Sequence, residues 1–145
     1  MTQVLAIGIG GAIGSLLRFW MSDWVHSLAG RGFPSATAPC VALPPPSLAS
    51  YGTLIVNVLG CLVMGVLFVL FTERFSDNAV LRAGILIGVL GGFTTFSSFS
   101  IETFSLMEQG AYIKAALNMA LSLVLCVGGT WLGVVLGRQL WNTAA

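Results

Sequence analysis

Four long apolar segments dominate the chain and decide in which solvent it can fold. They cover about residues 4–28, 52–72, 79–107 and 111–141 of the 145-residue sequence. A helix needs about 20 apolar residues to cross the hydrocarbon core of a bilayer, and each segment is long enough. Only 8% of the residues are charged, so little of the chain suits a soluble domain. The sequence therefore predicts an all-α integral membrane protein, a single domain of four transmembrane helices.

The third segment contains a stretch that is poorly suited to a continuous membrane helix. Residues 91–102 read Gly-Gly-Phe-Thr-Thr-Phe-Ser-Ser-Phe-Ser-Ile-Glu. A glycine pair carries a high entropic cost in a helix, and Thr and Ser side chains offer the backbone competing hydrogen bonds. We therefore expect the third helix to break near residues 91–95. Within a bilayer the freed backbone groups must face protein, water or an ion, so this stretch is the predicted functional centre.

Glycines repeat every four residues in the first, third and fourth segments. The repeats are Gly10 and Gly14, then Gly84, Gly88 and Gly92, and finally Gly129, Gly133 and Gly137. Residues four apart lie on one helix face, and small residues there let two membrane helices approach closely. We expect these faces to form helix contacts.

Polar side chains follow a second pattern with the same spacing. They are Thr53 and Asn57 in the second segment, and Asn118, Ser122, Cys126 and Thr130 in the fourth. Such residues either hold helices together by hydrogen bonds or line a pathway with donors for an anion. An unpaired buried amide costs about 1–3 kcal/mol, so Asn57 needs a partner in either case. We favour the pathway, because the Ser and Thr residues of the third segment would share its wall.

Aromatic and charged residues complete the candidate pathway. Phe96 and Phe99 follow the expected break, and the electropositive edge of a phenyl ring can face a desolvated anion. Arg18 lies deep in the first segment, so it either snorkels to the interface or lines a wet vestibule. The sequence contains no nucleophile–base pair, no metal-ligand cluster of His and Cys, and no phosphate-binding loop. We expect neither enzyme activity nor a nucleic-acid partner.

Basic residues are divided evenly between the two expected sides of the membrane. Arg74, Arg82 and Arg138 fall on one side, and Arg18, Arg31 and Lys114 fall on the other. Because an excess of Lys and Arg marks the cytoplasmic side, an even count favours neither orientation. Two copies inserted in opposite orientations could pair as an antiparallel homodimer, with their breaks facing each other across the two-fold axis. Carbonyl oxygens gathered there would suit a hard cation such as Na+.

Three stretches of the sequence resemble the signature segments of the Fluc (CrcB) fluoride channel family. They are residues 10–19, 52–60 and, most specifically, 91–100. The resemblance implies a passive fluoride-selective channel that exports fluoride and lowers its cytoplasmic concentration. It also implies a multi-pass protein of the inner (plasma) membrane, in contact with lipid. The expected assembly is an antiparallel, dual-topology homodimer with two fluoride pores and a structural Na+ that is not transported.

The resemblance also assigns roles to individual residues. The backbone carbonyls of Gly91 and Thr94 correspond to those that hold the Na+. The pathway residues at matching positions are Asn57, Phe96, Phe99, Thr53, Ser122 and the vestibule arginine, Arg18. Cys126 departs from the pattern, because a hydroxyl would serve the polar row better. The Pro-rich loop at residues 29–50 is longer than the family needs.

Two other functions are consistent with parts of the sequence. A proton-coupled exporter of the small multidrug type would also have four helices and dual topology. It needs a membrane-embedded carboxylate in the first helix, however, and residues 4–17 contain none, which leaves Glu102 as the best substitute. A non-transporting assembly subunit would need only the glycine faces, and the polar row and the break would then have no purpose.

Overall fold

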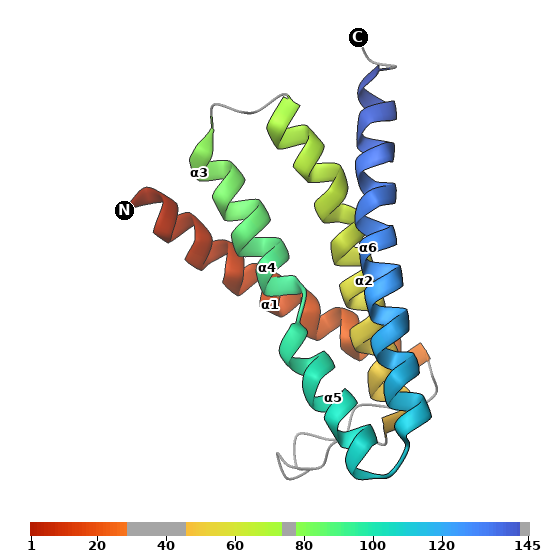
Figure 1. Ribbon diagram of the computed structural model, residues 1–145. Coiled ribbons are helices and arrows are strands. Elements are labelled where there is room, and N and C mark those ends of the chain that lie inside the picture. Colours follow the sequence, from red (N-terminus) through yellow and green to blue (C-terminus); the bar gives the residue numbers. More distant parts are fainter. Residues whose placement is uncertain (29–45, 74–77, 143–145) are drawn as a thin grey trace.

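Four helical spans alternate in direction along the described part of the chain (Figure 1). The structure, a computed structural model, describes residues 1–28, 46–73 and 78–142. Helix α1 covers Thr2–Leu28, α2 covers Pro46–Glu73 and α6 covers Tyr112–Asn142. The third span is assembled from shorter pieces, which are α3 (Ala79–Arg82), η1 (Ala83–Leu90), α4 (Gly91–Phe93) and α5 (Phe96–Glu108). The start of α1, the start of α3 and the end of α6 lie at one end of the molecule (Figure 1).

The surface of the spans is largely apolar. On α6, the side chains of Leu123, Val124, Val127 and Trp131 are all exposed. In the described residues, four helices are long and apolar enough to cross a membrane. Exposed apolar side chains along such helices are those that lipid or another apolar surface covers. The chain is a multi-pass membrane protein, as the sequence predicts.

Helix α2 begins earlier than the sequence pattern suggests. Its first residue is Pro46, whereas we expect the Pro-rich loop to continue to residue 50. Proline is well placed at the first position of a helix, because the N–H that it lacks would have no helical partner there. Residues 29–45, which hold the rest of the expected loop, lie outside the described residues.

Glycine faces join the spans into two closely packed pairs. Helix α1 lies against η1 and α4, and α2 lies against α6. A Cβ atom added to Gly10 of α1 would collide with the carbonyl of Gly84, and one added to Gly65 of α2 would collide with the backbone of α6 beside Gly133. The predicted glycine contacts are therefore confirmed, since the backbones approach more closely than a side chain would allow.

The segment that leads to the break is wound more loosely than an α-helix. Residues Ala83–Leu90 form turns of the π type. Turns of this type are rare and often occur near functional sites. The third span therefore departs from regular α-helical geometry before it reaches the break.

Candidate functional site

The third span is interrupted at Thr94 and Thr95, where the backbone is extended. Thr94 has φ −78° and ψ 153°, and Thr95 has φ −146° and ψ 111°. Helix α4 ends at Phe93 and α5 begins at Phe96, so the predicted break is confirmed. The hydroxyl of Thr95 caps α5 by accepting a hydrogen bond from the backbone N–H of Ser98 at 3.2 Å.

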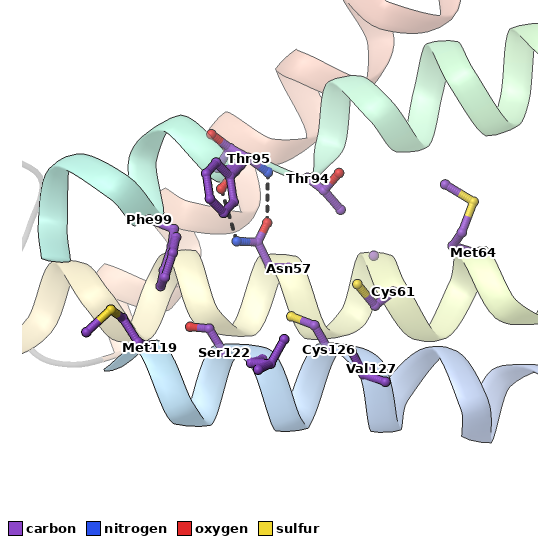
Figure 2. A pocket seen from close by; sticks show the side chains of 13 residues that line it. Asn57, Cys61, Met64, Thr94, Thr95, Phe99, Met119, Ser122, Cys126 and Val127 are labelled. Atoms are coloured by element: carbon purple, nitrogen blue, oxygen red, sulfur yellow. Dashed lines mark hydrogen bonds between the residues drawn. The ribbon is translucent and has the colours of Figure 1, made fainter. Parts of the chain in front are cut away.

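Asn57 of α2 fastens the break to the neighbouring helix (Figure 2). Its Oδ1 accepts from the backbone N–H of Thr95 at 2.8 Å, and its Nδ2 donates to the Thr95 carbonyl at 3.1 Å. Thr95 is only 7% exposed, so these bonds satisfy buried backbone groups that the break has removed from the helix. Asn57 therefore holds helices together, and its amide carries a second hydrogen that can serve another acceptor.

The break also changes the surroundings of the two carbonyls at which we expect Na+. In a continuous α-helix the N–H of Thr95 would donate to Gly91, and the N–H of Ser98 would donate to Thr94. Here the first N–H donates to Asn57 and the second to the Thr95 hydroxyl. Gly91 is exposed, and an added side chain there would meet nothing within 4 Å. Both carbonyls lose their helical donors, and backbone oxygens of this kind fit a hard cation.

A cavity of about 370 Å³ lies beside the break, between α2, α5 and α6 (Figure 2). Its lining includes Asn57, Phe96, Phe99 and Ser122, which are four of the expected pathway residues. The rings of Phe96 and Phe99 lie with their centroids 5.4 Å apart and their planes at 46°. Phe96 is 78% exposed in the single chain. The structure thus brings these four residues together, and their roles in transport stay predictions.

Arg18, Thr53 and Gly91 do not line this cavity. Arg18 is half-buried on α1. The hydroxyl of Thr53 donates a hydrogen bond to Oε1 of Glu102 on α5. The other carboxylate oxygen of Glu102 is buried and has no hydrogen-bond partner within the described ranges. Thr53 lies one helical turn before Asn57 on α2. Its hydroxyl is already bonded to the Glu102 carboxylate.

The polar row of α6 divides between different surroundings. Asn118 is buried, and its Nδ2 donates to the hydroxyl of Thr103 on α5 at 2.9 Å. Ser122 and Cys126 line the cavity. The hydroxyl of Thr130 donates to the Cys126 carbonyl in the preceding turn at 3.1 Å. The middle of the row faces the cavity, whereas its two ends form hydrogen bonds within the protein.

The sequence patterns do not single out the part that Thr95 plays in this site. Thr95 bonds to Asn57 and also approaches the hydroxyls of Ser97 and Ser98 at 3.1 Å. Cys126, a member of the polar row, lines the cavity together with Cys61 of α2. Cys61 follows Asn57 by four residues, and this spacing places both on the same face of α2.

Known proteins resemble the chain over most of its length. Residues 5–134 match the family described as CrcB-like protein, Camphor Resistance (CrcB). A protein of Coxiella burnetii (strain Dugway 5J108-111), named fluoride-specific ion channel FluC, is 49% identical over 95% of this chain and 99% of its own length. A protein of the same name from Methylococcus capsulatus is 44% identical over 95% of this chain and 54% of its own length. Another, from Geobacter sulfurreducens, is 41% identical over 97% of this chain and 100% of its own length.

The names of these relatives agree with the expectation that the chain is not an enzyme. All of them are named as ion channels. The family match covers far more than half of the sequence, and it includes the break and the cavity. The chain therefore belongs to the CrcB family of membrane proteins.

Proposed function

We propose that the protein is a passive, fluoride-selective channel that exports fluoride and so lowers its cytoplasmic concentration. The observation that carries the proposal is the cavity beside the break, where Asn57, Ser122 and the phenylalanine pair meet. Relatives that match almost the full chain are named fluoride-specific ion channels, which supports fluoride as the ion.

The chemistry of the cavity suits a small anion that has lost its water. The second amide hydrogen of Asn57 and the hydroxyl of Ser122 can donate hydrogen bonds. The ring edges of Phe96 and Phe99 are weakly positive and offer contact without a full charge. None of the described residues that line the cavity carries a charged side chain. An ion bound by such groups can also leave, as conduction requires.

The proposed assembly is an antiparallel, dual-topology homodimer. Phe96 and Gly91 are exposed in the single chain, beside a backbone that is not helical. Because lipid cannot satisfy irregular backbone, protein or water must cover the break in the bilayer. A second copy in the opposite orientation would cover it and bring its own Gly91 and Thr94 carbonyls to the two-fold axis. These oxygens from the two chains would hold a structural Na+ that is not transported.

Topology can be tested separately from transport. A tag at the C-terminus should be found on both sides of the native membrane when its accessibility is measured. Detection of every C-terminus on one side would contradict the antiparallel dimer.

The transport test is fluoride efflux from liposomes that contain the purified protein. A fluoride electrode records efflux while valinomycin carries the balancing charge, and chloride is measured in parallel. We expect rapid fluoride efflux without chloride efflux. The variants Phe96→Ile and Asn57→Asp should slow fluoride efflux at least about tenfold. This change corresponds to about 1.4 kcal/mol in the free-energy barrier to efflux. Phe104→Ile is the matched control, because Phe104 is exposed on α5 and does not line the cavity.

The exporter of the small multidrug type is not favoured by the relatives found. It makes a different prediction in the same liposomes. If fluoride stayed inside while a pH gradient drove uptake of an organic cation, the channel proposal would be wrong.

A further inference from the structure

The cavity beside the break contains a pair of thiols to which the proposed function assigns no role. Cys61 of α2 and Cys126 of α6 both line the cavity, and both are free cysteines. Figure 2 shows Cys61 on α2 and Cys126 on the adjacent helix α6, both among the side chains that line the cavity.

Close packing of the two helices fixes the positions of the thiols. A Cβ atom added to Gly129 of α6 would lie 3.9 Å from the Cβ atom of Cys61. Gly129 follows Cys126 by about one turn, so Cys61 packs on the α6 backbone next to Cys126. Gly65 and Gly133 hold the same two helices in backbone contact further along. Because these contacts fix the two backbones, Cys61 and Cys126 are held on facing helices beside one cavity before any ligand arrives, and the pair is to that extent preorganised.

Two preorganised thiols are suitable ligands for a soft metal ion. Thiolate sulfur is a soft ligand that selects soft ions. No cluster of three or more His, Cys, Asp and Glu residues occurs in the described part of the chain. An ion that requires four such ligands, as Zn2+ does, would have too few. Hg2+ differs because two sulfur ligands satisfy it.

We propose that Cys61 and Cys126 together bind a soft, two-coordinate metal ion such as Hg2+, and that the bound ion blocks the cavity. Binding forms two Hg–S bonds, breaks two S–H bonds and releases two protons to water, with no change in oxidation state. Asn57 and Ser122 each precede one of the cysteines by one helical turn, so the ion would lie in line with the proposed pathway. The blocking part of this inference rests on the proposed function, whereas the binding part does not.

Metal binding can be tested without measuring transport. The third cysteine of the chain, Cys40, is replaced by Ser in all samples, so that Cys61 and Cys126 are the only thiols. One equivalent of Hg2+ should then protect both thiols from a small maleimide. The variants Cys61→Ser and Cys126→Ser each keep one thiol, and the serine hydroxyl preserves the size of the side chain.

Competition with glutathione distinguishes a two-sulfur site from a single thiol. Bound mercury is measured after dialysis against increasing glutathione. The protein with both cysteines should retain Hg2+ at glutathione concentrations at least about tenfold higher than either serine variant, because its second ligand acts at a high effective concentration. Equal retention by all three proteins, or protection of only one thiol per Hg2+, would overturn the proposal.

Blocking is tested by fluoride efflux from liposomes before and after addition of HgCl2. Each variant is compared with its own metal-free rate. Efflux through the protein with both cysteines should fall at least about tenfold and recover when a dithiol removes the metal, since an occupied pathway cannot conduct. The double variant Cys61→Ser/Cys126→Ser should keep its metal-free rate. If the protein retained Hg2+ and fluoride efflux did not fall, the blocking part of the proposal would be wrong. If no metal-free sample released fluoride, the proposed function would be wrong, and the binding result would still stand.

Discussion

The two halves of the third span are attached to the rest of the molecule in different ways. Before the break, η1 and α4 lie against α1, with Gly88 and Gly92 in contact with its backbone. After the break, α5 is joined to its neighbours by side chains, because Thr103 accepts a hydrogen bond from Asn118 and Glu102 accepts one from Thr53. The attachment of the first half depends on glycines, which have no side chain to keep the backbones apart. The attachment of the second half depends on hydrogen bonds between particular side chains.

This difference shows how one membrane span can both anchor the protein and form a site. Helices in lipid gain little from burying apolar groups against each other, so they associate through close packing and hydrogen bonds. Close packing before the break leaves few positions for polar side chains. Hydrogen bonding after the break brings polar groups into the interior, where Asn57 and Thr95 form one side of the cavity.

The largest expected effect tests the close packing of the first half. A Cβ atom on Gly14 of α1 would collide with the Val89 carbonyl and approach the backbone nitrogen of Phe93. Gly14→Ala should lower the free energy of unfolding by about 3 kcal/mol or more, because backbone atoms cannot move aside as side chains do. This change in the free energy of unfolding is measured by unfolding the protein in detergent micelles with increasing SDS.

A matched variant on the same helix provides the control. An added Cβ atom at Gly8 would meet nothing within 4 Å. Gly8→Ala should therefore be neutral or stabilise the protein by up to about 1 kcal/mol, because alanine favours the helix. A similar loss of unfolding free energy in Gly14→Ala and Gly8→Ala would show that the packing of α1 against η1 does not require backbone contact.

The second prediction concerns the junction between the two halves. Asn57→Leu removes both hydrogen bonds to Thr95 and leaves its buried N–H and carbonyl unpaired. We expect a loss of about 2–3 kcal/mol in the free energy of unfolding, because unpaired buried groups are costly. Hydrogen exchange at the Thr95 amide should become faster, while exchange in η1 stays unchanged. Thr130→Val is the control, since the Thr130 hydroxyl bonds only within its own helix.

The third prediction tests the side-chain attachment of the second half. Thr103→Val leaves the buried Nδ2 of Asn118 without its acceptor and should cost about 1–2 kcal/mol in the free energy of unfolding. Further replacement of Asn118 by Leu should recover part of this loss, since no polar group then remains unpaired. A double-mutant cycle gives the interaction energy, and strictly additive losses would argue against a hydrogen bond that stabilises the protein.

The smallest expected effect lies at the start of the third span. Oδ1 of Asn78 accepts a hydrogen bond from the backbone N–H of Leu81 at 3.0 Å and caps α3. Asn78→Ala should lower the free energy of unfolding by about 1 kcal/mol, whereas Asn78→Ser should lie close to the natural protein. The same SDS titration measures the free energy of unfolding of both variants. An Asn78→Ala value identical to that of the natural protein would show that the cap does not add to the stability of the first half.

Much of the fold can be predicted from the sequence because the signals are local. Apolar length predicts the four spans, and glycine spacing predicts which faces pack closely. The glycine pair and the hydroxyl side chains predict the break, which lies at Thr94 and Thr95.

The candidate site is predicted only in part. Asn57, Phe96, Phe99 and Ser122 share a cavity. The polar row of α6 looks uniform in sequence, yet Asn118 bonds to Thr103 while Ser122 faces the cavity. Helical spacing reports which residues share a face, but it does not report what that face contacts.

The number of spans, the glycine faces and the position of the break follow from the amino-acid sequence alone, because they depend on residues within a few turns of one another. The partners of the polar side chains depend on the tertiary structure. Asn57 and Thr95 are 38 residues apart, and Thr53 and Glu102 are 49 apart. The meeting of Cys61 and Cys126 in one cavity likewise depends on how α2 lies against α6. Such contacts are set by the packing of whole helices, which local patterns do not encode.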